Sequence, residues 1–364
     1  MAEEKRANKK TPQKGSIIGR LFTSLLKLLV FAVFIGGVVI GAGAWWLNNP
    51  VTVAHSPVEV EISSGTSPRG VVQAIVNAGV DVQPELLYQY FRWSGQSRDI
   101  RAGNYEFTAA DTPYSILQKL LNGSEITRTI VFPEGITFAQ IRQRLNDAPD
   151  IKHDTVNMTD AQIMEALGKP GQHPEGLFFP DTYVFSKGSS DLQILRRAMQ
   201  HMESILDSVW QERDADVPLK TPYEALILAS IIEKETGRPQ DRFMVAGVFT
   251  NRLRRGMLLQ TDPTVIYGLG DAYTGRITRR NLDTDTPYNT YTRMGLTPTP
   301  IAMPGKDSLL AAVHPAKTNA LYFVSRGDGS SHFSNTLSDH NRAVDHYIRG
   351  RATPPRPSSG IIEP

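Results

Sequence analysis

Cysteine is absent from the 364-residue chain, which excludes disulfide scaffolds, thiol catalysis, iron–sulfur clusters and cysteine zinc sites. The sequence also lacks a P-loop and a G-x-G-x-x-G after a predicted strand, so no motif indicates nucleotide binding. It contains no H-E-x-x-H pair, and the spacings of His332, His340 and His346 match no standard metal site. We therefore expect no cofactor and no metal, and we expect these histidines to form hydrogen bonds within the fold or to line a cleft.

An excess of either charge is also missing, because 39 basic and 37 acidic residues leave a formal net charge of +2. The distribution is uneven. Residues 1–27 carry seven Lys or Arg and two Glu, a net +5, which leaves 32 basic and 35 acidic residues, a net −3. The positive charge is thus a short tail and not a basic surface, so we expect no nucleic-acid partner.

One long apolar run follows the basic tail. Residues 28–47 (LLVFAVFIGGVVIGAGAWWL) hold no charge and would span about 30 Å as a helix, the thickness of a bilayer core. The positive-inside rule predicts that residues 1–27 are cytoplasmic and that the chain after Asn48 lies outside. A cleaved signal peptide is the alternative, since Ala42-Gly43-Ala44 resembles a cleavage site, but the run exceeds the usual apolar region of about 7–15 residues.

The pattern of the chain after the apolar run predicts an α+β protein in two parts. Residues 57–130 alternate short strands and helices, beginning with the period-two strand Val58–Ile62, and form a small α+β module. Residues 131–350 are longer and richer in helix, and form a larger mixed α/β domain. Residues 351–364 contain four prolines and no apolar periodicity before Ile361, so we expect a disordered tail.

The best-defined helix covers Thr221–Thr236, with a capping box at its start and Gly237 and Pro239 after its end. Glu233 and Glu235 lie in its last turn, about 200° apart, so they cannot share one site. The helix dipole and apolar neighbours should raise the pKa of a carboxyl there, as a general acid requires. A solvated Glu paired with Lys234 or Arg238 is the structural alternative, and periodicity does not choose between Glu233 and Glu235.

A set of ordered motifs from about Arg101 to His340 resembles the endolytic murein transglycosylases, or YceG-like proteins. The motifs are Pro133-Glu134-Gly135, Glu175-Gly176-x-x-Phe179-Pro180-Asp181-Thr182-Tyr183, Ala229-Ser230-Ile231-Ile232-Glu233-Lys234-Glu235-Thr236, Val248-Phe249-x-Asn251-Arg252-Leu253, Gln260-Thr261-Asp262-Pro263-Thr264-Val265, Pro287-Tyr288-Asn289-Thr290-Tyr291 and Pro298-x-Pro300-Ile301. The chain departs from the pattern at Thr286, where a Ser is common, and keeps a hydroxyl there.

The resemblance implies a bitopic inner-membrane protein whose periplasmic part has a LysM-like module at 57–130 and a catalytic domain at 131–350. It implies that Glu233 is the catalytic acid and that the reaction is a lyase cleavage between N-acetylmuramic acid and N-acetylglucosamine, leaving a 1,6-anhydro end. Peptidoglycan glycan strands are then the substrate. Penicillin-binding proteins and other cell-wall synthesis proteins are candidate partners, with termination or trimming of nascent strands as the role.

Residues that suit a sugar polymer occur in the loop-like stretches of the second part. Polar side chains and aromatic faces bind sugars, and binding residues concentrate on loops. The predicted substrate-binding residues are Gln260, Thr261, Asp262, Tyr288, Asn289 and Tyr291. Ordinary packing is the alternative for the two tyrosines.

Two other functions stay open from the sequence. Hydrolytic muramidases use a second carboxylate, and Asp181 or Asp262 could supply it here. A non-catalytic murein-binding scaffold would need only the anchor and the LysM-like module.

Overall fold

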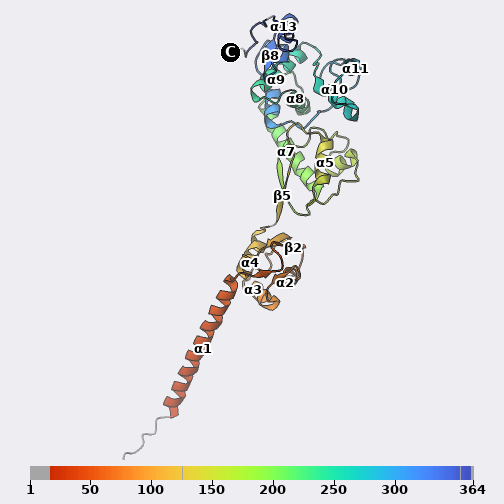
Figure 1. Ribbon diagram of the computed structural model, residues 1–364. Helices are drawn as coiled ribbons and strands as arrows, with labels where there is room; N and C mark the ends of the chain where they lie inside the picture. The colour runs from red at the N-terminus through yellow and green to blue at the C-terminus, as the bar shows by residue number, and fades with distance from the viewer. Residues whose placement is uncertain (1–16, 125, 353, 362–364) are drawn as a thin grey trace, which may run out of the picture. The chain divides into compact units, whose positions relative to one another are not determined.

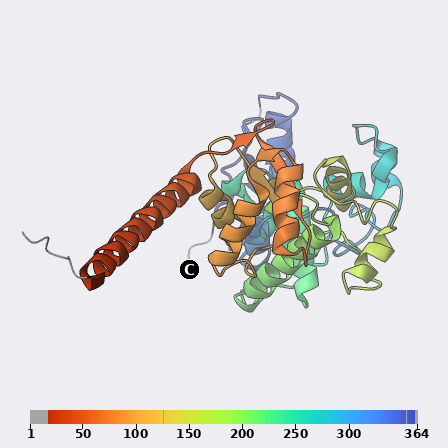
Figure 2. The same cartoon turned by 90° about the horizontal axis from the view of Figure 1, so that it is seen from below.

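The computed structural model describes residues 17–124, 126–352 and 354–361 of the chain. Helix α1 spans Ile17–Asn48 and is the long red helix in Figures 1 and 2. Its segment Leu21–Asn48 is long and apolar enough to cross a membrane, and its large apolar side chains are exposed, as expected for a surface that faces lipid. The helix begins earlier than the predicted span. Residues 1–16 of the predicted cytoplasmic tail lie outside the described part of the chain.

The chain divides into two units, Met1–Ile126 and Thr127–Pro364. The sequence placed this boundary after residue 130. The division falls earlier because strand β5 (Thr127–Val131) pairs antiparallel with β6 (Thr182–Ser186) and so belongs to the second unit.

The first unit is a small α+β module around one hydrophobic core. Strand β2 (Val58–Ile62) alternates buried and exposed residues, which confirms the period-two prediction, and pairs antiparallel with β4 (Gly103–Phe107). The other elements of this module are the paired strands β1 (Thr52–Val53) and β3 (Val80–Asp81) and the helices α2 (Pro68–Asn77), α3 (Pro84–Trp93) and α4 (Pro113–Asn122). Each of these helices has a proline at its first position, where the missing N–H costs no hydrogen bond.

The second unit consists mainly of helices, with strands in antiparallel pairs. Its elements, besides β5 and β6, are α5 (Phe138–Asp147), α6 (Asp160–Ala166), α7 (Asp191–Gln211), α8 (Pro222–Glu235), α9 (Pro239–Arg254), α10 (Asp262–Leu269), the 3₁₀ helix η1 (Gly270–Ala272), α11 (Arg279–Asp283), α12 (Lys306–Val313), β7 (Tyr322–Ser325), β8 (Ser331–Ser334) and α13 (Leu337–Tyr347). One hydrophobic cluster surrounds α5 and α7, and another surrounds α8, α9 and α12. Figure 1 shows α8 and α9 within the same part of the unit.

Helix α8 lies at the centre of the second cluster and packs against α7, α9 and α12. All eight residues from Ala225 to Ile232 are buried. The helix is therefore apolar on every side, and its functional groups emerge only in the last turn. Pro239, which the sequence suggested as a stop, is also the first residue of α9, a helix that was not predicted.

The C-terminal segment 354–361 lies within the stretch predicted to be disordered, and three of its residues form hydrogen bonds to the second unit. The Ser359 N–H donates to the carbonyl of Phe333 in β8 at 2.9 Å, and the Phe333 N–H donates to Ser358 Oγ at 3.0 Å. The Thr318 hydroxyl donates to the Gly360 carbonyl at 3.0 Å. Backbone hydrogen bonds of this kind need no apolar pattern, which is why hydropathy gave no sign of the contact.

Candidate active site

Glu233 extends from the last turn of α8 to the first turn of α12. Its Oε2 accepts hydrogen bonds from the Gly305 N–H at 3.0 Å and from the Ser308 hydroxyl at 2.7 Å. Its Oε1 lies 3.8 Å from the guanidinium of Arg242, and its side chain is 7% exposed. The sequence analysis took into account the dipole of Glu233's own helix and the apolar residues beside it. The structure adds the N-terminus of α12 and a buried arginine, both of which stabilise a carboxylate.

A second carboxyl, Glu134, lies beside Glu233 and was not predicted as a site residue. A Cβ placed on Gly305 would meet Glu134 Oε1 at 1.8 Å, so the carboxyl of Glu134 occupies the space above the residue that donates to Glu233. Burial and the Glu233 carboxylate raise the pKa of Glu134, and the charge of Arg242 opposes this rise. The Pro133-Glu134-Gly135 motif was the one sequence feature that could have pointed to Glu134. However, Glu134 is far from Glu233 in the sequence, so no spacing rule predicts that the two carboxyls lie close together.

The loop that carries Glu134 is fastened at several points. The Gly135 N–H donates to the Met303 carbonyl and the Met303 N–H donates to the Ile136 carbonyl, each at 2.8 Å. Lys234 Nζ donates to the Gly135 carbonyl at 3.1 Å. Gly135 has φ +74, a left-handed conformation that favours glycine. These bonds hold the Glu134 loop against the end of α8.

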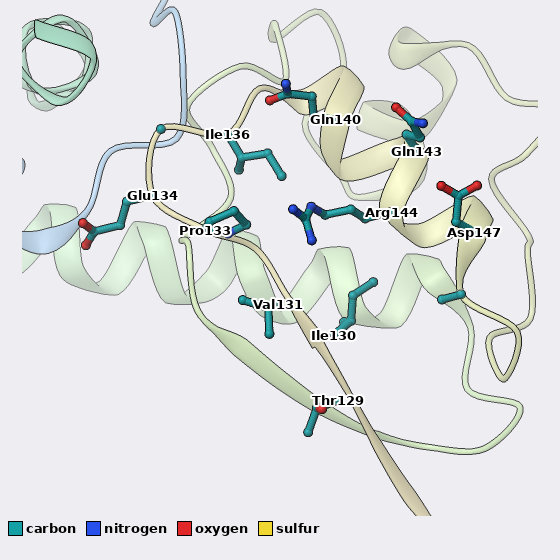
Figure 3. Close-up of a pocket in the computed structure, with 12 residues that line it drawn as sticks. Thr129, Ile130, Val131, Pro133, Glu134, Ile136, Gln140, Gln143, Arg144 and Asp147 are labelled. Carbon is teal, nitrogen blue, oxygen red and sulfur yellow. The ribbon is translucent and has the colours of Figure 1, made fainter. Parts of the chain in front are cut away.

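A groove opens beside this loop and runs along α5 (Figure 3). Its volume is about 810 Å³, and its walls come from β5, the Glu134 loop and the exposed face of α5. The twelve residues that line it are Thr129, Ile130, Val131, Pro133, Glu134, Gly135, Ile136, Gln140, Gln143, Arg144, Asp147 and Ala148. Glu134 lies at the end of the groove that is nearest to Glu233, because a Cβ on Gly135 would lie 3.8 Å from Glu233 Cγ.

Glu235 points to a different set of partners. Its Oε2 accepts a hydrogen bond from the Thr261 hydroxyl at 2.5 Å. Burial raises the pKa of Glu235, while the bond from Thr261 acts in the opposite direction. Glu233 and Glu235 therefore contact different residues, as their angular separation of about 200° on the helix requires.

Four of the predicted substrate-binding residues lie together near Glu235. Thr261 is buried, and its N–H donates to Thr290 Oγ1 at 3.1 Å. The Tyr291 hydroxyl donates to the exposed Asp262 carboxylate at 2.5 Å. Gln260 is exposed and has φ +52, an unusual backbone conformation for a residue other than glycine. Gln260, Asp262 and Tyr291 thus remain accessible or half-accessible.

The other two predicted binding residues take part in packing. Asn289 is 1% exposed, and its Nδ2 donates to the carbonyls of Asn281, Leu282 and Thr284 at 2.7–3.3 Å. The Tyr288 hydroxyl shares a 2.9 Å hydrogen bond with Thr299 Oγ1, and its ring lies edge-on to that of Tyr267 at 5.0 Å. These contacts shape the loop, and they involve the groups that would otherwise bind a sugar.

Glu175 is a buried carboxyl that joins α5 to α10. Its Oε1 accepts from the Phe138 N–H and its Oε2 accepts from the Tyr267 hydroxyl, both at 3.0 Å. Burial raises its pKa to about 7, although both hydrogen bonds lower it. This side chain is 3% exposed, so it supports the site without facing solvent.

The carboxylates suggested as partners for hydrolysis have other neighbours. Asp181 lies 3.6 Å from His201, and Asp262 is engaged by Tyr291. The late histidines pack against aromatic rings, such as His340 on Tyr322 at 5.2 Å. Within the described ranges, no group of three or more His, Asp or Glu is arranged to hold a metal ion.

Comparisons with known proteins agree on one family. A sequence profile described as the YceG-like family matches residues 60–346. A Bacillus subtilis protein named endolytic murein transglycosylase is 32% identical over 317 residues, covering 82% of this chain and 87% of that protein. A Streptococcus pneumoniae protein of the same name is 25% identical over 336 residues, and the match covers 81% of this chain but 59% of the longer relative.

A solved structure shows the same resemblance in three dimensions. The crystal structure of a yceG-like protein from Listeria monocytogenes superposes with a TM-score of 0.50 and 30% sequence identity. The match covers 79% of this chain and 99% of the Listeria chain.

Proposed function

This chain belongs to the YceG-like family, and we propose that it is an endolytic murein transglycosylase, a lyase that cleaves peptidoglycan glycan strands internally. The observation that carries the proposal is the placement of Glu233, a nearly buried carboxyl held by two donors and facing a guanidinium. The names of the relatives support the same reaction class.

In the proposed reaction Glu233 acts first as an acid and then as a base. It protonates the oxygen between N-acetylmuramic acid and N-acetylglucosamine, and the bond from that oxygen to C1 breaks. The 6-hydroxyl of the muramyl residue attacks the same C1, and the Glu233 carboxylate takes its proton. One bond to C1 is replaced by another, no water is consumed, and a 1,6-anhydro end results.

The neighbours of Glu233 suit this proton cycle. Oε2 is held by Gly305 and Ser308, so Oε1 is the oxygen left to exchange a proton with the substrate. Arg242 and the α12 N-terminus stabilise the carboxylate that forms after the first transfer. Gln260, Asp262 and Tyr291 are proposed to contact the sugar strand, with Thr261, Tyr288 and Asn289 holding their loop.

The proposal extends to the rest of the chain. Helix α1 is proposed to anchor the protein in the cytoplasmic (inner) membrane with its basic end inside, leaving residues after Asn48 outside. The first unit is proposed to be a LysM-like module that engages glycan, and the exposed indole of Trp93 offers an apolar face for a sugar ring. An anchored enzyme would reach strands as they form, close to penicillin-binding proteins and other synthesis enzymes, where it would terminate or trim them.

Mass spectrometry of glycan strands incubated with the full-length protein tests the reaction. Shorter strands with anhydro ends, lighter by one water than hydrolysed ends, are expected. Intact strands would instead favour a binding scaffold.

Hydrolysis is a second candidate, and the position of Glu134 favours it. A carboxyl next to the acid could activate water, as in inverting glycosidases, or act as the nucleophile, as in retaining ones. Glu134→Gln separates the two reactions. A transglycosylase should still yield only anhydro ends, whereas a hydrolase that depends on Glu134 should lose at least about 10²-fold in rate and produce no anhydro ends at all.

A further inference from the structure

The groove beside the Glu134 loop has the size and position of a ligand site. Its volume of about 810 Å³ falls within the usual range of roughly 300–1,000 Å³ for small-molecule sites. One end is formed by Glu134 and Gly135, the residues that adjoin Glu233. A ligand that reaches Glu233 from this side therefore extends along α5.

The lining combines an apolar floor with polar side chains on one wall. Ile130, Val131, Pro133 and Ile136 supply the floor, and Val131 is 47% exposed. Gln143 and Gln140, one turn apart on α5, supply amide groups that match the N-acetyl and hydroxyl groups of a sugar. Gln143 offers its whole amide, and Gln140 offers its NH₂ group because its Oε1 accepts from the Thr137 N–H at 3.0 Å. This mixture suits an amphipathic carbohydrate better than a lipid or a peptide helix.

Arg144 gives the groove its charge preference. In Figure 3 its guanidinium points into the groove towards Ile136 and Pro133, and away from Asp147. Over the described ranges 17–124, 126–352 and 354–361, Arg144 forms no ion pair within 4.0 Å, unlike its neighbour Arg142, which pairs with Asp160 at 2.7 Å. A guanidinium presented this way matches a carboxylate with two parallel hydrogen bonds.

We propose that this groove is a subsite for the muramyl part of the glycan, and that Arg144 binds a carboxylate carried on its lactyl substituent. The inference rests on the proposed function and adds the substrate feature that is recognised. The carboxylate has two sources, the acidic peptide stem or the free lactyl group of a strand without stems. Both place an anion on the same sugar, several atoms away from the bond that breaks.

The test compares Arg144→Gln with the wild type on strands that bear stems, on strands stripped of stems, and on both after conversion of their carboxylates to neutral amides. We expect Arg144→Gln to raise KM about 10- to 100-fold on at least one carboxylate-bearing strand, with kcat nearly unchanged, because a charge-assisted hydrogen bond is lost. On the neutral strands the two proteins should be equal. Arg144→Lys should recover part of the loss, and Arg342→Gln, at another exposed helical arginine on α13, is the matched control.

The pattern of loss identifies the source. A loss confined to stem-bearing strands assigns the peptide carboxylate, a loss confined to stripped strands assigns the lactyl carboxylate, and both results support the subsite. Equal KM values on every strand, or the same loss on neutral strands, would overturn it.

A binding measurement separates this proposal from the proposed activity. Strand affinity is measured in Glu233→Gln and in Glu233→Gln/Arg144→Gln, where no turnover is needed. A 10-fold or greater weakening in the double variant supports the subsite even if the wild type releases no anhydro product. Equal affinities overturn the subsite even if the wild type is an active transglycosylase.

Discussion

Glu233 and Glu235 are two residues apart on α8, but the regions that receive them differ in charge, exposure and role. The acid region comprises Glu233, Glu134, Arg242, the α12 N-terminus and the adjoining groove. The loop region comprises Glu235, Thr261, Asp262 and Tyr291. In the acid region Glu233 lies near a guanidinium and near Glu134, a second carboxyl that lines the groove. In the loop region the buried Glu235 accepts a hydrogen bond from one hydroxyl.

The proposed catalytic carboxyl, Glu233, differs from Glu235 in more than burial. Burial raises the pKa of Glu235, which is not the proposed acid, so a raised pKa alone does not mark an acid. Glu233 has donors that fix one oxygen and a neighbouring groove through which a substrate can approach. Glu235 instead ties the Gln260–Tyr291 loops to the helix.

The largest effect is expected for Glu233→Gln. The amide keeps the size and an oxygen that accepts from Gly305 and Ser308, but it has no proton to give, so activity should fall about 10²–10⁴-fold. The melting temperature should change little. Anhydro-product formation and thermal unfolding of the purified full-length variant are the measurements, and full activity would remove Glu233 from the mechanism.

Glu175, which accepts hydrogen bonds from α5 and α10, should make stability depend on pH. Its folded pKa of about 7 lies above the ordinary 4.5, so the folded state binds the proton more tightly. This contribution is complete below about pH 4.5 and is lost as pH rises through 7, by at most about 3 kcal/mol. Denaturant unfolding across this range should show the fall in wild type and a flatter profile in Glu175→Gln. Parallel profiles would contradict the assignment.

A smaller effect is expected for Ser308→Ala in the acid region. The Ser308 hydroxyl donates to Glu233 Oε2 at 2.7 Å, and a hydrogen bond to a charged group is worth roughly 1.5–3 kcal/mol. The rate should therefore fall about 10- to 100-fold if that bond is strongest in the carboxylate state. Steady-state kinetics on glycan strands measure it. Ser115→Ala, on α4 in the first unit, is the matched control and should leave the rate unchanged.

The smallest effect is expected for Glu235→Gln in the loop region. The amide oxygen still accepts from Thr261, and removal of a costly buried charge should leave stability at pH 7 equal or slightly higher, by up to about 1 kcal/mol. Activity should stay within about threefold of wild type if the loop is held, since a bond of this kind is worth only about 1 kcal/mol. A loss as large as that of Glu233→Gln, in a well-folded protein, would reverse the roles of the two regions.

The sequence predicted an element of the fold correctly where the pattern that defines the element lies within the element's own residues. The length of the apolar helix α1, the alternation of strand β2 and the caps of helix α8 are each carried by consecutive residues. Helix α9 was missed because Pro239 serves equally as the end of one helix and the beginning of the next. The segment 354–361 was missed because its contacts with β8 are hydrogen bonds of backbone and serine, which leave no hydropathy pattern.

The candidate site also has one part that the sequence predicts and one part that depends on tertiary packing. Helical periodicity is enough to place two carboxyls at the end of a buried helix and to direct them to different sides. Which of them meets Arg242, Ser308 and Glu134, and which meets Thr261, depends on tertiary packing. Thr261 is 26 residues from Glu235 and Ser308 is 75 residues from Glu233 along the chain, so these contacts form only when the whole core packs, and no local spacing predicts them.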